Sequence, residues 1–178
     1  NLNIDIRVIL PKYSNKELRD LEEETPFRTV ISRLRVPFGG QEFDVAVQRD
    51  DRYGVTTYFV DNDEFFGCDA RIYWPPEIPI PDCEVEIPNI QRFAFFSRAV
   101  LEIVKRLQFR HNVIHCNDWH TALIPTYLRT LYSNDPFFRD TGSVLTLHNV
   151  GRGFQGIWPL YRKPEILELT GLNAYSEL

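Results

Sequence analysis

Apolar and polar residues alternate along much of the first third of the chain, which is the pattern of strands that bury one face. Residues 4–10 alternate in this way, and the run ends at Pro11, which reads as a strand closed by a turn. Three more β-prone runs follow at 29–36, 42–48 and 54–60. The connections between these runs are short and contain Gly-Gly or Asp-Asp-Arg, so we expect antiparallel or mixed pairing in this part of the chain.

The spacing of apolar residues becomes helical in the middle of the chain. Between residues 89 and 108, apolar side chains recur every three or four positions, which predicts a long amphipathic helix that covers one face of a sheet. Residues 16–24 are charged and lack such periodicity, so we expect an exposed helix there. Five prolines lie within 61–88, which excludes a central strand or a helix and predicts a long loop.

Two apolar, β-prone runs in the second half each end in histidine and polar residues. The first leads through 113–118 into a helical pattern that continues to Leu131. The second, 143–147, is typical of a buried strand and ends at His148-Asn149. Right-handed crossovers place the carboxyl ends of both strands on one side of a parallel sheet. The sequence therefore predicts an α/β fold with these two strand ends at one edge.

The side chains at these strand ends suit a polyhydroxylated ligand. Doubly wound α/β sheets bind ligands in the crevice outside the carboxyl ends of their strands. An acid, a broad aromatic face, imidazoles and an amide at that edge can hold the hydroxyl groups of a sugar. The candidate site residues are Asp118, Trp119, His120, His148 and Asn149. The glycine-rich segment that follows can approach a ligand closely.

Other interpretations of the same residues stay open. Asp118 can be a helix N-cap whose carboxylate accepts hydrogen bonds from the first turn, and Trp119 can be a core residue. Arg92 lies near the first turn of the long helix, where a cation gains nothing from the helix dipole. It therefore either meets a substrate or a carboxylate, or is a solvated or structural arginine. A metal site is disfavoured, because residues two apart across a turn diverge. Its ligands would be His115, Asp118, His120 and His148.

Composition and charge narrow the function classes. The chain has 178 residues, 43% hydrophobic and 25% charged, which is enough for one globular domain with a sizeable core. Its net charge of −5 and pI near 5.4 offer no basic footprint for nucleic acid or an anionic membrane, which favours a neutral polymer or a small molecule. No apolar run approaches the roughly 20 residues of a membrane span. Cys68, Cys83 and Cys116 lack metal-type spacing and predict reduced thiols, with Cys116 a small buried side chain.

Several segments carry longer motifs. Residues 89–99 begin Asn-Ile-Gln-Arg-Phe, and residues 115–123 read His-Cys-Asn-Asp-Trp-His-Thr-Ala-Leu. Further along, residues 146–149 read Thr-Leu-His-Asn and residues 154–156 read Phe-Gln-Gly. In order along the chain, these segments resemble motifs of the bacterial glycogen synthase and plant starch synthase family. Its members are retaining GT-B glucosyltransferases that use nucleotide-diphosphate glucose. The resemblance extends over about residues 4–178.

The resemblance implies a fold and an activity for the chain. Residues 1–178 would form a fragment of the catalytic N-terminal domain, the Rossmann-like half of a GT-B fold, with a mainly parallel sheet flanked by helices and incomplete at both ends. The full-length protein would elongate an α-1,4-glucan from ADP-glucose, or alternatively UDP-glucose, with retention and without a metal or other cofactor. Its partners would be the glucan acceptor, the nucleotide sugar and the C-terminal domain of the same polypeptide, with no nucleic acid or membrane. It would be cytoplasmic in a bacterium or plastidial in a plant.

The resemblance also implies roles for individual residues. Asp118 and Trp119 would line the acceptor subsite, and His148 would contact the transferring glucose near its hydroxymethyl group with support from Asn149. Asp118 and His148 are thus the candidate catalytic residues. The substrate-binding candidates lie in the matching motifs or, for one tyrosine, in the proline-rich loop: Trp119, His120, Asn149, Arg92, Tyr73 and Gln155.

The chain also departs from the family pattern. The Lys-x-Gly-Gly-Leu loop that follows the family's first strand is not in this sequence, and the chain contains no Met, so we expect that strand and loop to precede Asn1. The C-terminal domain, which supplies the family's diphosphate-binding Arg and Lys and a Glu near the sugar, would also be missing. Pro88 replaces the usual Asp before Asn89, and the loop around Tyr73 lacks the usual Tyr-Gly. We therefore expect weak donor binding and no turnover by this chain alone. The alternative function is that of a non-catalytic glucan-binding or scaffold fragment.

Overall fold

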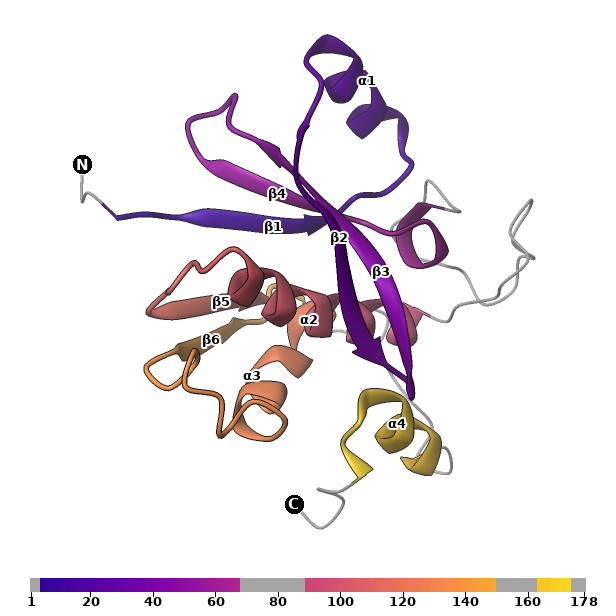
Figure 1. Cartoon of the computed structure of the whole chain (residues 1–178), viewed down its shortest axis with the longest axis vertical. Coiled ribbons are helices and arrows are strands. Elements are labelled where there is room, and N and C mark those ends of the chain that lie inside the picture. Colours follow the sequence, from indigo (N-terminus) through magenta and orange to yellow (C-terminus); the bar gives the residue numbers. More distant parts are fainter. Residues whose placement is uncertain (1–3, 68–88, 150–162, 174–178) are drawn as a thin grey trace. The chain divides into compact units, whose positions relative to one another are not determined.

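The structure is a computed structural model that describes residues 4–67, 89–149 and 163–173. Figure 1 shows the course of the chain through its helices and strands. The chain divides into two compact units. One unit comprises residues 1–35 and 44–88, and the other comprises residues 36–43 and 89–178.

The first unit is built on a four-stranded mixed sheet with the strand order β1-β4-β3-β2. Strand β1 is parallel to β4, and β3 is antiparallel to β4, which confirms the predicted mixed pairing. The first strand begins at Arg7 instead of residue 4, because its pairing partner β4 begins at Thr56, the residue opposite Arg7. The tip of the β2–β3 hairpin, residues 36–43, belongs to the second unit. The elements are β1 (Arg7–Pro11), α1 (Lys16–Glu24), β2 (Arg28–Phe38), β3 (Gln41–Asp50) and β4 (Thr56–Asp61).

Helix α1 contains no buried residue, as its charged sequence predicts. Asn15 is its N-cap, because the Asn15 side chain accepts a hydrogen bond from the Leu18 N–H at 3.0 Å. Lys12, just after β1, forms salt bridges with Glu22 of α1 at 3.1 Å and with Asp61 of β4 at 3.3 Å. These two ion pairs hold the helix close to the carboxyl ends of the two parallel strands.

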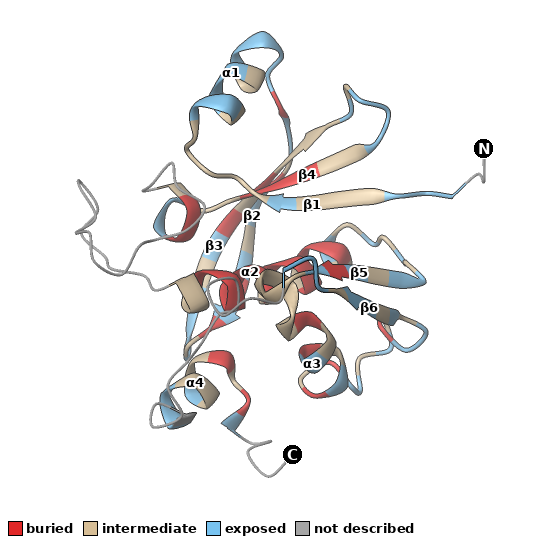
Figure 2. Ribbon diagram, turned by 180° about the vertical axis from the view of Figure 1, so that it is seen from behind, coloured by how far each residue is buried: buried red, intermediate tan, exposed pale blue. Residues whose placement is uncertain are grey.

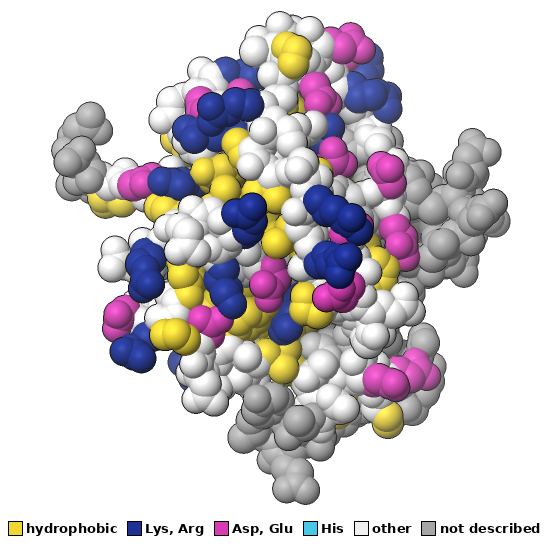
Figure 3. Space-filling model, in the orientation of Figure 1, with side chains coloured by type: hydrophobic (Ala, Val, Ile, Leu, Met, Phe, Trp, Pro, Cys, Tyr) yellow, Lys and Arg dark blue, Asp and Glu magenta, His cyan; other side chains and the backbone are white. Residues whose placement is uncertain are grey.

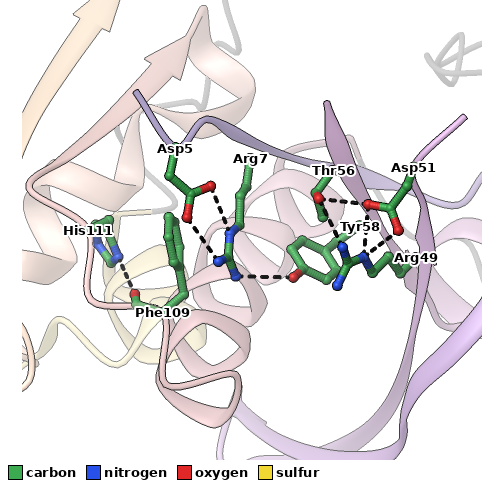
Figure 4. Close-up of polar contacts among 8 residues, drawn as sticks. All are labelled: Asp5, Arg7, Arg49, Asp51, Thr56, Tyr58, Phe109 and His111. Carbon is green, nitrogen blue, oxygen red and sulfur yellow. Dashed lines mark hydrogen bonds and ion pairs between the residues drawn. The ribbon is translucent and has the colours of Figure 1, made fainter. Parts of the chain in front are cut away.

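Charged side chains of this unit pair locally across the sheet surface. Arg7 donates a hydrogen bond to the Tyr58 hydroxyl at 3.3 Å, and Arg49 donates to Asp51 at 2.9 Å (Figure 4). Thr56 also donates to Asp51, at 2.7 Å. Both donors stabilise the charged carboxylate, first Arg49 and then Thr56, and so lower the pKa of Asp51. Acidic and basic side chains are interspersed on the face shown in Figure 3.

A single π-helical turn, η1 (Asp63–Gly67), follows β4 and begins the proline-rich stretch. Asn62 caps this turn by accepting a hydrogen bond from the Phe65 N–H at 2.9 Å. A Cβ atom at Gly67 would lie 2.7 Å from Asp63 Oδ1, so a side chain at this position would displace the Asp63 carboxylate. The predicted loop character of the rest of this stretch concerns residues 68–88, which lie outside the described residues.

The second unit is built on a long buried helix and a two-stranded parallel sheet. Helix α2 packs against η2, α3 and α4, and much of its surface is buried (Figure 2). No described helix, α2 included, is long and apolar enough to cross a membrane. The predicted helix after Asp118 begins with a 3₁₀ turn instead of an α-helical one. The elements are α2 (Asn89–Arg106), β5 (Val113–Asn117), η2 (Trp119–Thr121), α3 (Leu123–Arg129), β6 (Gly142–Thr146) and α4 (Lys163–Thr170).

Strand β6 is not buried, so the prediction of a buried strand at 143–147 is wrong. Val144 is 51% exposed and Leu147 is 55% exposed, and Val113 of β5 is exposed as well. A parallel sheet is buried only where other elements cover both of its faces. Among the described elements, α3 packs against β6. An element on one face of a sheet leaves the apolar side chains of the other face exposed.

Candidate functional site at the ends of β5 and β6

The carboxyl ends of β5 and β6 lie side by side, because the two strands are parallel with Asn117 opposite Thr146. The next residue, Asp118, connects them. Its backbone N–H donates to the Thr146 carbonyl at 2.8 Å, and its carboxylate Oδ1 accepts from the backbone N–H groups of His148 at 2.7 Å and Asn149 at 3.4 Å. The prediction that these two strand ends meet at one edge is confirmed.

The N-cap interpretation of Asp118 is wrong. Its side chain makes no capping hydrogen bond to the 3₁₀ turn that follows, because the carboxylate is turned toward the end of β6. The Asp118 backbone has φ +55° and ψ −172°, a conformation that residues other than glycine rarely adopt. Such a conformation costs about 1–3 kcal/mol and persists only where surrounding contacts impose it. Here the backbone bond to Thr146 and the two bonds to the carboxylate impose it.

His148 and Asn149 are exposed at this edge. His148 Nε2 lies 3.0 Å from Asn117 Oδ1, so the imidazole that follows β6 is bound to the side chain at the end of β5. Both hydrogen bonds to the Asp118 carboxylate go to Oδ1, and within the described chain Oδ2 accepts none. The edge therefore offers solvent a carboxylate oxygen, one imidazole nitrogen and an amide.

Trp119 and His120 form an aromatic cluster with Phe93 of α2. The Phe93 ring meets the indole edge-on at 4.8 Å between ring centres and meets the imidazole at 4.4 Å. The indole and imidazole rings are 4.7 Å apart and inclined by 30°. Ser97 of α2 donates to the His120 carbonyl at 3.3 Å. Trp119 is half-buried instead of lying in the core, so it combines a supported position with a partly accessible ring.

Burial lowers the pKa of His120, and the nearby negative charge of Asp118 opposes this shift in part. The neutral imidazole is therefore favoured at this position. Burial also raises the pKa of the Cys116 thiol to about 11, against a weaker opposing effect of a hydrogen bond with Thr121. Cys116 is a buried free thiol at the end of β5, as the sequence predicts.

Arg92 is only 1% exposed, so the solvated alternative for this residue is wrong. A buried guanidinium requires partners, which is compatible with a structural role or with the predicted contact to a substrate or carboxylate. Two other candidates, Tyr73 and Gln155, lie outside the described residues.

The histidines at this edge are engaged with neighbouring polar groups. His115 Nε2 lies 2.7 Å from Thr146 Oγ1, across the two strands. Within residues 4–67, 89–149 and 163–173, no group of three or more His, Cys, Asp or Glu side chains is placed to hold a metal ion. The ring contacts of His120 with Phe93 and Trp119 also direct this imidazole toward α2.

Three residues that sequence analysis did not single out shape the edge: Asn117, Thr146 and Phe93. Asn117 positions the His148 ring, Thr146 receives the Asp118 N–H, and Phe93 supports the aromatic pair. Asn117 and Thr146 lie inside the recognised motifs, so their position directly before the candidate residues was an available signal. Phe93 lies in the motif that begins at Asn89, so it carried the same signal, although its place on the apolar face of the predicted helix is also that of an ordinary core residue.

The arrangement suits a ligand with many hydroxyl groups. A half-buried indole can stack on the apolar face of a sugar ring, while a carboxylate, an imidazole and an amide can bind its hydroxyls. The family model described as the starch synthase catalytic domain matches residues 1–177. The chain belongs to the starch synthase catalytic domain family.

Curated relatives of this family are similar over nearly the whole chain. The chain is 34% identical to a glycogen synthase of Desulforamulus reducens over 98% of its own length and 34% of that protein. It is 40% identical to glycogen synthase 2 of Geobacter sulfurreducens over 96% of the chain and 32% of that protein. The chain thus spans about a third of the length of the curated relatives it matches.

A solved structure supports the fold. The catalytic domain of starch synthase IV from Arabidopsis thaliana, bound to ADP and acarbose, matches 82% of this chain and 27% of that chain with a TM-score of 0.62 and 21% identity. The expected Rossmann-like N-terminal half of a GT-B fold is therefore confirmed.

Proposed function

We propose that the protein of which this chain is a part elongates an α-1,4-glucan by transferring glucose from ADP-glucose with retention, and that this chain supplies the acceptor-side half. Membership of the starch synthase catalytic domain family supports this proposal. The curated glycogen synthases and the ADP- and acarbose-bound starch synthase structure support it further. UDP-glucose is the alternative donor.

The observation that carries the proposal is the hydrogen bond that the backbone N–H of His148 donates to the Asp118 carboxylate at 2.7 Å. It fixes the end of β6 against the end of β5, and so holds an imidazole and an amide beside an acid and an indole. We assign the acceptor subsite to Trp119, which stacks on a sugar ring, and to Asp118 Oδ2, which orients an acceptor hydroxyl. His148 and Asn149 then face the transferring glucose.

Retaining transfer makes particular demands on such a site. The acceptor 4-hydroxyl must be held against the anomeric carbon, on the same face as the leaving diphosphate, while positive charge develops on the sugar ring. Positioning and electrostatic stabilisation therefore provide most of the rate enhancement. His120 and Phe93 contribute by supporting the Trp119 ring, and Asn117 contributes by orienting His148.

The test is transfer of labelled glucose from ADP-glucose to a maltooligosaccharide primer by the full-length protein. We expect His148→Ala to lower kcat/KM by about 100-fold or more, because a preorganised polar contact at the reacting sugar is lost. Trp119→Ala should instead raise the KM for the primer. Asp140→Asn, in the exposed turn before β6, is the matched control and should leave both constants unchanged. Full activity of His148→Ala would refute this assignment.

The second candidate is a glucan-binding fragment without catalysis, which the half-buried Trp119 ring favours, because an indole can stack on a sugar ring without any donor-binding group. The isolated 178-residue chain distinguishes the two. We expect it to bind maltoheptaose through Trp119 and to transfer no glucose, because the donor-binding groups of the family lie in the other half. Glucose transfer by the isolated chain would contradict this expectation. Transfer by the full-length protein would show that the protein is an enzyme and not only a binding module.

A further inference from the structure

A pocket with a volume of about 360 Å³ lies within the second unit, and its lining includes none of the candidate site residues. Its walls are the tip of the β2–β3 hairpin at 37–42, the Arg98 side chain of α2, Leu131 after α3, and residues 168–171 at the end of α4. This volume is within the range of small-molecule sites. The pocket is therefore large enough for a ligand of its own.

The hairpin wall of the pocket is fixed to α4. The Gly39 N–H donates to the Leu169 carbonyl at 2.9 Å. Gly39 has a φ of +57°, and a Cβ atom at this position would lie 3.2 Å from Leu169 Cδ1. The close approach and the backbone conformation both require glycine. The pocket is thus a defined feature of the fold.

Arg98 supplies the positive charge of this pocket. Its guanidinium carbon lies 4.7 Å from the Tyr132 ring centre and 5.7 Å from that of Tyr127, which is cation–π geometry. Stacking uses the flat face of the guanidinium and leaves its edge for hydrogen bonds. Yet Nε and Nη1 are buried without a hydrogen-bond partner among the described residues. No carboxylate of the described chain forms a salt bridge with Arg98 either.

A buried hydroxyl next to Arg98 is also unpaired. Tyr127 is completely buried, and its hydroxyl has no hydrogen-bond partner in the part of the chain that the structure describes. Burial raises the pKa of Tyr127, so its phenol keeps the proton and remains a donor. The neighbouring Tyr132 differs, because its hydroxyl donates to Glu102. Buried donors without acceptors are rare in folded proteins and indicate a missing partner.

We propose that this pocket binds a small oxyanion, the carboxylate or phosphate group of a ligand, at the donor edge of Arg98. Binding requires the Arg98 side chain to turn its buried Nε–H and Nη1–H groups toward the pocket, where they can donate charge-assisted hydrogen bonds to the oxygens of such a group. The site does not depend on the proposed glucan transfer and shares no residue with it. It would let a small acidic metabolite bind to the same unit that carries the strand ends of β5 and β6.

Two carboxylates restrict how the anion lies in the pocket. Glu42 and Glu168 also line it, and Glu168 is exposed at the end of α4. An anion therefore binds at the Arg98 end of the pocket. This repulsion limits the affinity for a bare anion, so a dissociation constant on the order of 1 mM is expected for inorganic phosphate.

The experiment follows the Nε–H resonance of Arg98 in ¹⁵N-labelled 178-residue chain by NMR. This signal is assigned by its loss in Arg98→Lys, which keeps the charge and the apolar stem but has no Nε–H. Inorganic phosphate and sodium acetate are added separately, each against sodium chloride at equal ionic strength. We expect a saturable shift of the Arg98 signal with one or both anions. A shift with phosphate alone indicates a phosphate ligand, and a shift with acetate alone indicates a carboxylate. Shifts with both anions show that the site accepts either group.

Variants separate the pocket from other basic surfaces. Because Arg98→Gln and Arg98→Lys lack the Arg98 Nε–H signal, their binding is compared through the backbone amide signals of Gly39 and Gly171, which also line the pocket. Arg98→Gln should bind at least about tenfold more weakly, since it loses the charge-assisted hydrogen bonds. Arg110→Gln is the matched control, because Arg110 also stacks on an aromatic ring, Phe137 at 5.4 Å, but does not line the pocket. It should bind like the unmodified chain. No saturable shift, a shift equal to that with chloride, or equal binding by Arg98→Lys and the unmodified chain would overturn the proposal.

Discussion

Asn117 Oδ1 lies 3.0 Å from His148 Nε2, so the last residue of β5 accepts a hydrogen bond from an imidazole that follows β6. Because an amide oxygen can only accept, Nε2 must carry the proton in neutral His148. Nδ1 is then the acceptor that a ligand hydroxyl can use. We expect ¹⁵N–¹H correlation spectra of the neutral imidazole to show the Nε2–H tautomer for His148.

Asn117→Ala provides the comparison for this tautomer. Without the amide oxygen, the His148 signals should move toward a mixture of the two tautomers, while those of His111 should not change. His111 is a suitable reference because its Nδ1 lies 2.9 Å from the Phe109 carbonyl, outside the site. A predominant Nδ1–H form of His148 in the unmodified chain would show that the Asn117 contact does not exist in solution.

The Asp118 carboxylate should be important for stability as well as for the site. Asp118→Ala leaves the His148 and Asn149 N–H groups without their acceptor, and we expect a loss of about 1–3 kcal/mol in the free energy of unfolding. In Asp118→Asn an acceptor oxygen is kept, and asparagine tolerates positive φ better than most residues. The free energy of unfolding should therefore fall less than in Asp118→Ala. Urea denaturation followed by tryptophan fluorescence measures both variants. Asp140→Ala is the exposed control, and equal stability of all three variants would contradict the cross-strand role.

Sequence analysis located this edge but not the bonds within it. The parallel pairing of β5 and β6 follows from two β-prone runs separated by a helical pattern, and this brought His148 near Asp118 in the prediction. Whether the carboxylate caps its own helix or bonds to the next strand depends on the Asp118 φ of +55°. That angle is imposed by the contact with Thr146, which no local sequence pattern encodes.

The exposure of β6 had a different cause. An apolar run such as 143–147 indicates that a strand tends to be covered, but it does not indicate which part of a chain covers it. By contrast, the boundaries of α1 were predicted correctly, because a charged segment between Asn15 and Thr25 depends on its own cap and not on packing. The pocket at Arg98 could not be predicted at all, since its walls come from segments about 60 and 130 residues apart in the sequence.

The buried thiol of Cys116 should react slowly. Burial raises its pKa to about 11 from the ordinary value of 9.0, and at pH 8 this two-unit shift lowers the thiolate fraction about 100-fold. We expect Ellman's reagent to modify Cys116 about 100-fold more slowly in the folded chain than in urea, with Cys68 and Cys83 replaced by serine. The neutral thiol is favoured in the folded state, so its contribution to stability is lost as the pH rises from 9 through 11. Equal rates with and without urea would contradict the burial of this thiol.

Gly39 and Gly40 test the contact between the hairpin tip and α4. Both have positive φ, but a Cβ atom at Gly40 would meet nothing within 4 Å, whereas one at Gly39 would press on Leu169. Gly40→Ala should lower the free energy of unfolding by about 1 kcal/mol, because alanine is strained in this backbone conformation. Urea denaturation should show that Gly39→Ala lowers the free energy of unfolding by about 1–2 kcal/mol more than Gly40→Ala. The added loss comes from the close contact of the new Cβ atom with Leu169. In a double-mutant cycle, Leu169→Ala should remove most of the difference, and additive effects would argue against the contact.

His120 should make stability depend on pH in the mildly acidic range. Burial lowers its pKa below the ordinary value of 6.5, so the unfolded chain binds a proton more readily than the folded one. The contribution of the neutral imidazole is present above pH 6.5 and is lost as the pH falls through the lowered pKa. The free energy of unfolding should therefore fall more steeply between pH 7 and pH 5 for the unmodified chain than for His120→Gln. Asp118→Asn should steepen this dependence, because the charge that opposes the shift is removed, and a slope unaffected by His120→Gln would show that the imidazole is solvated.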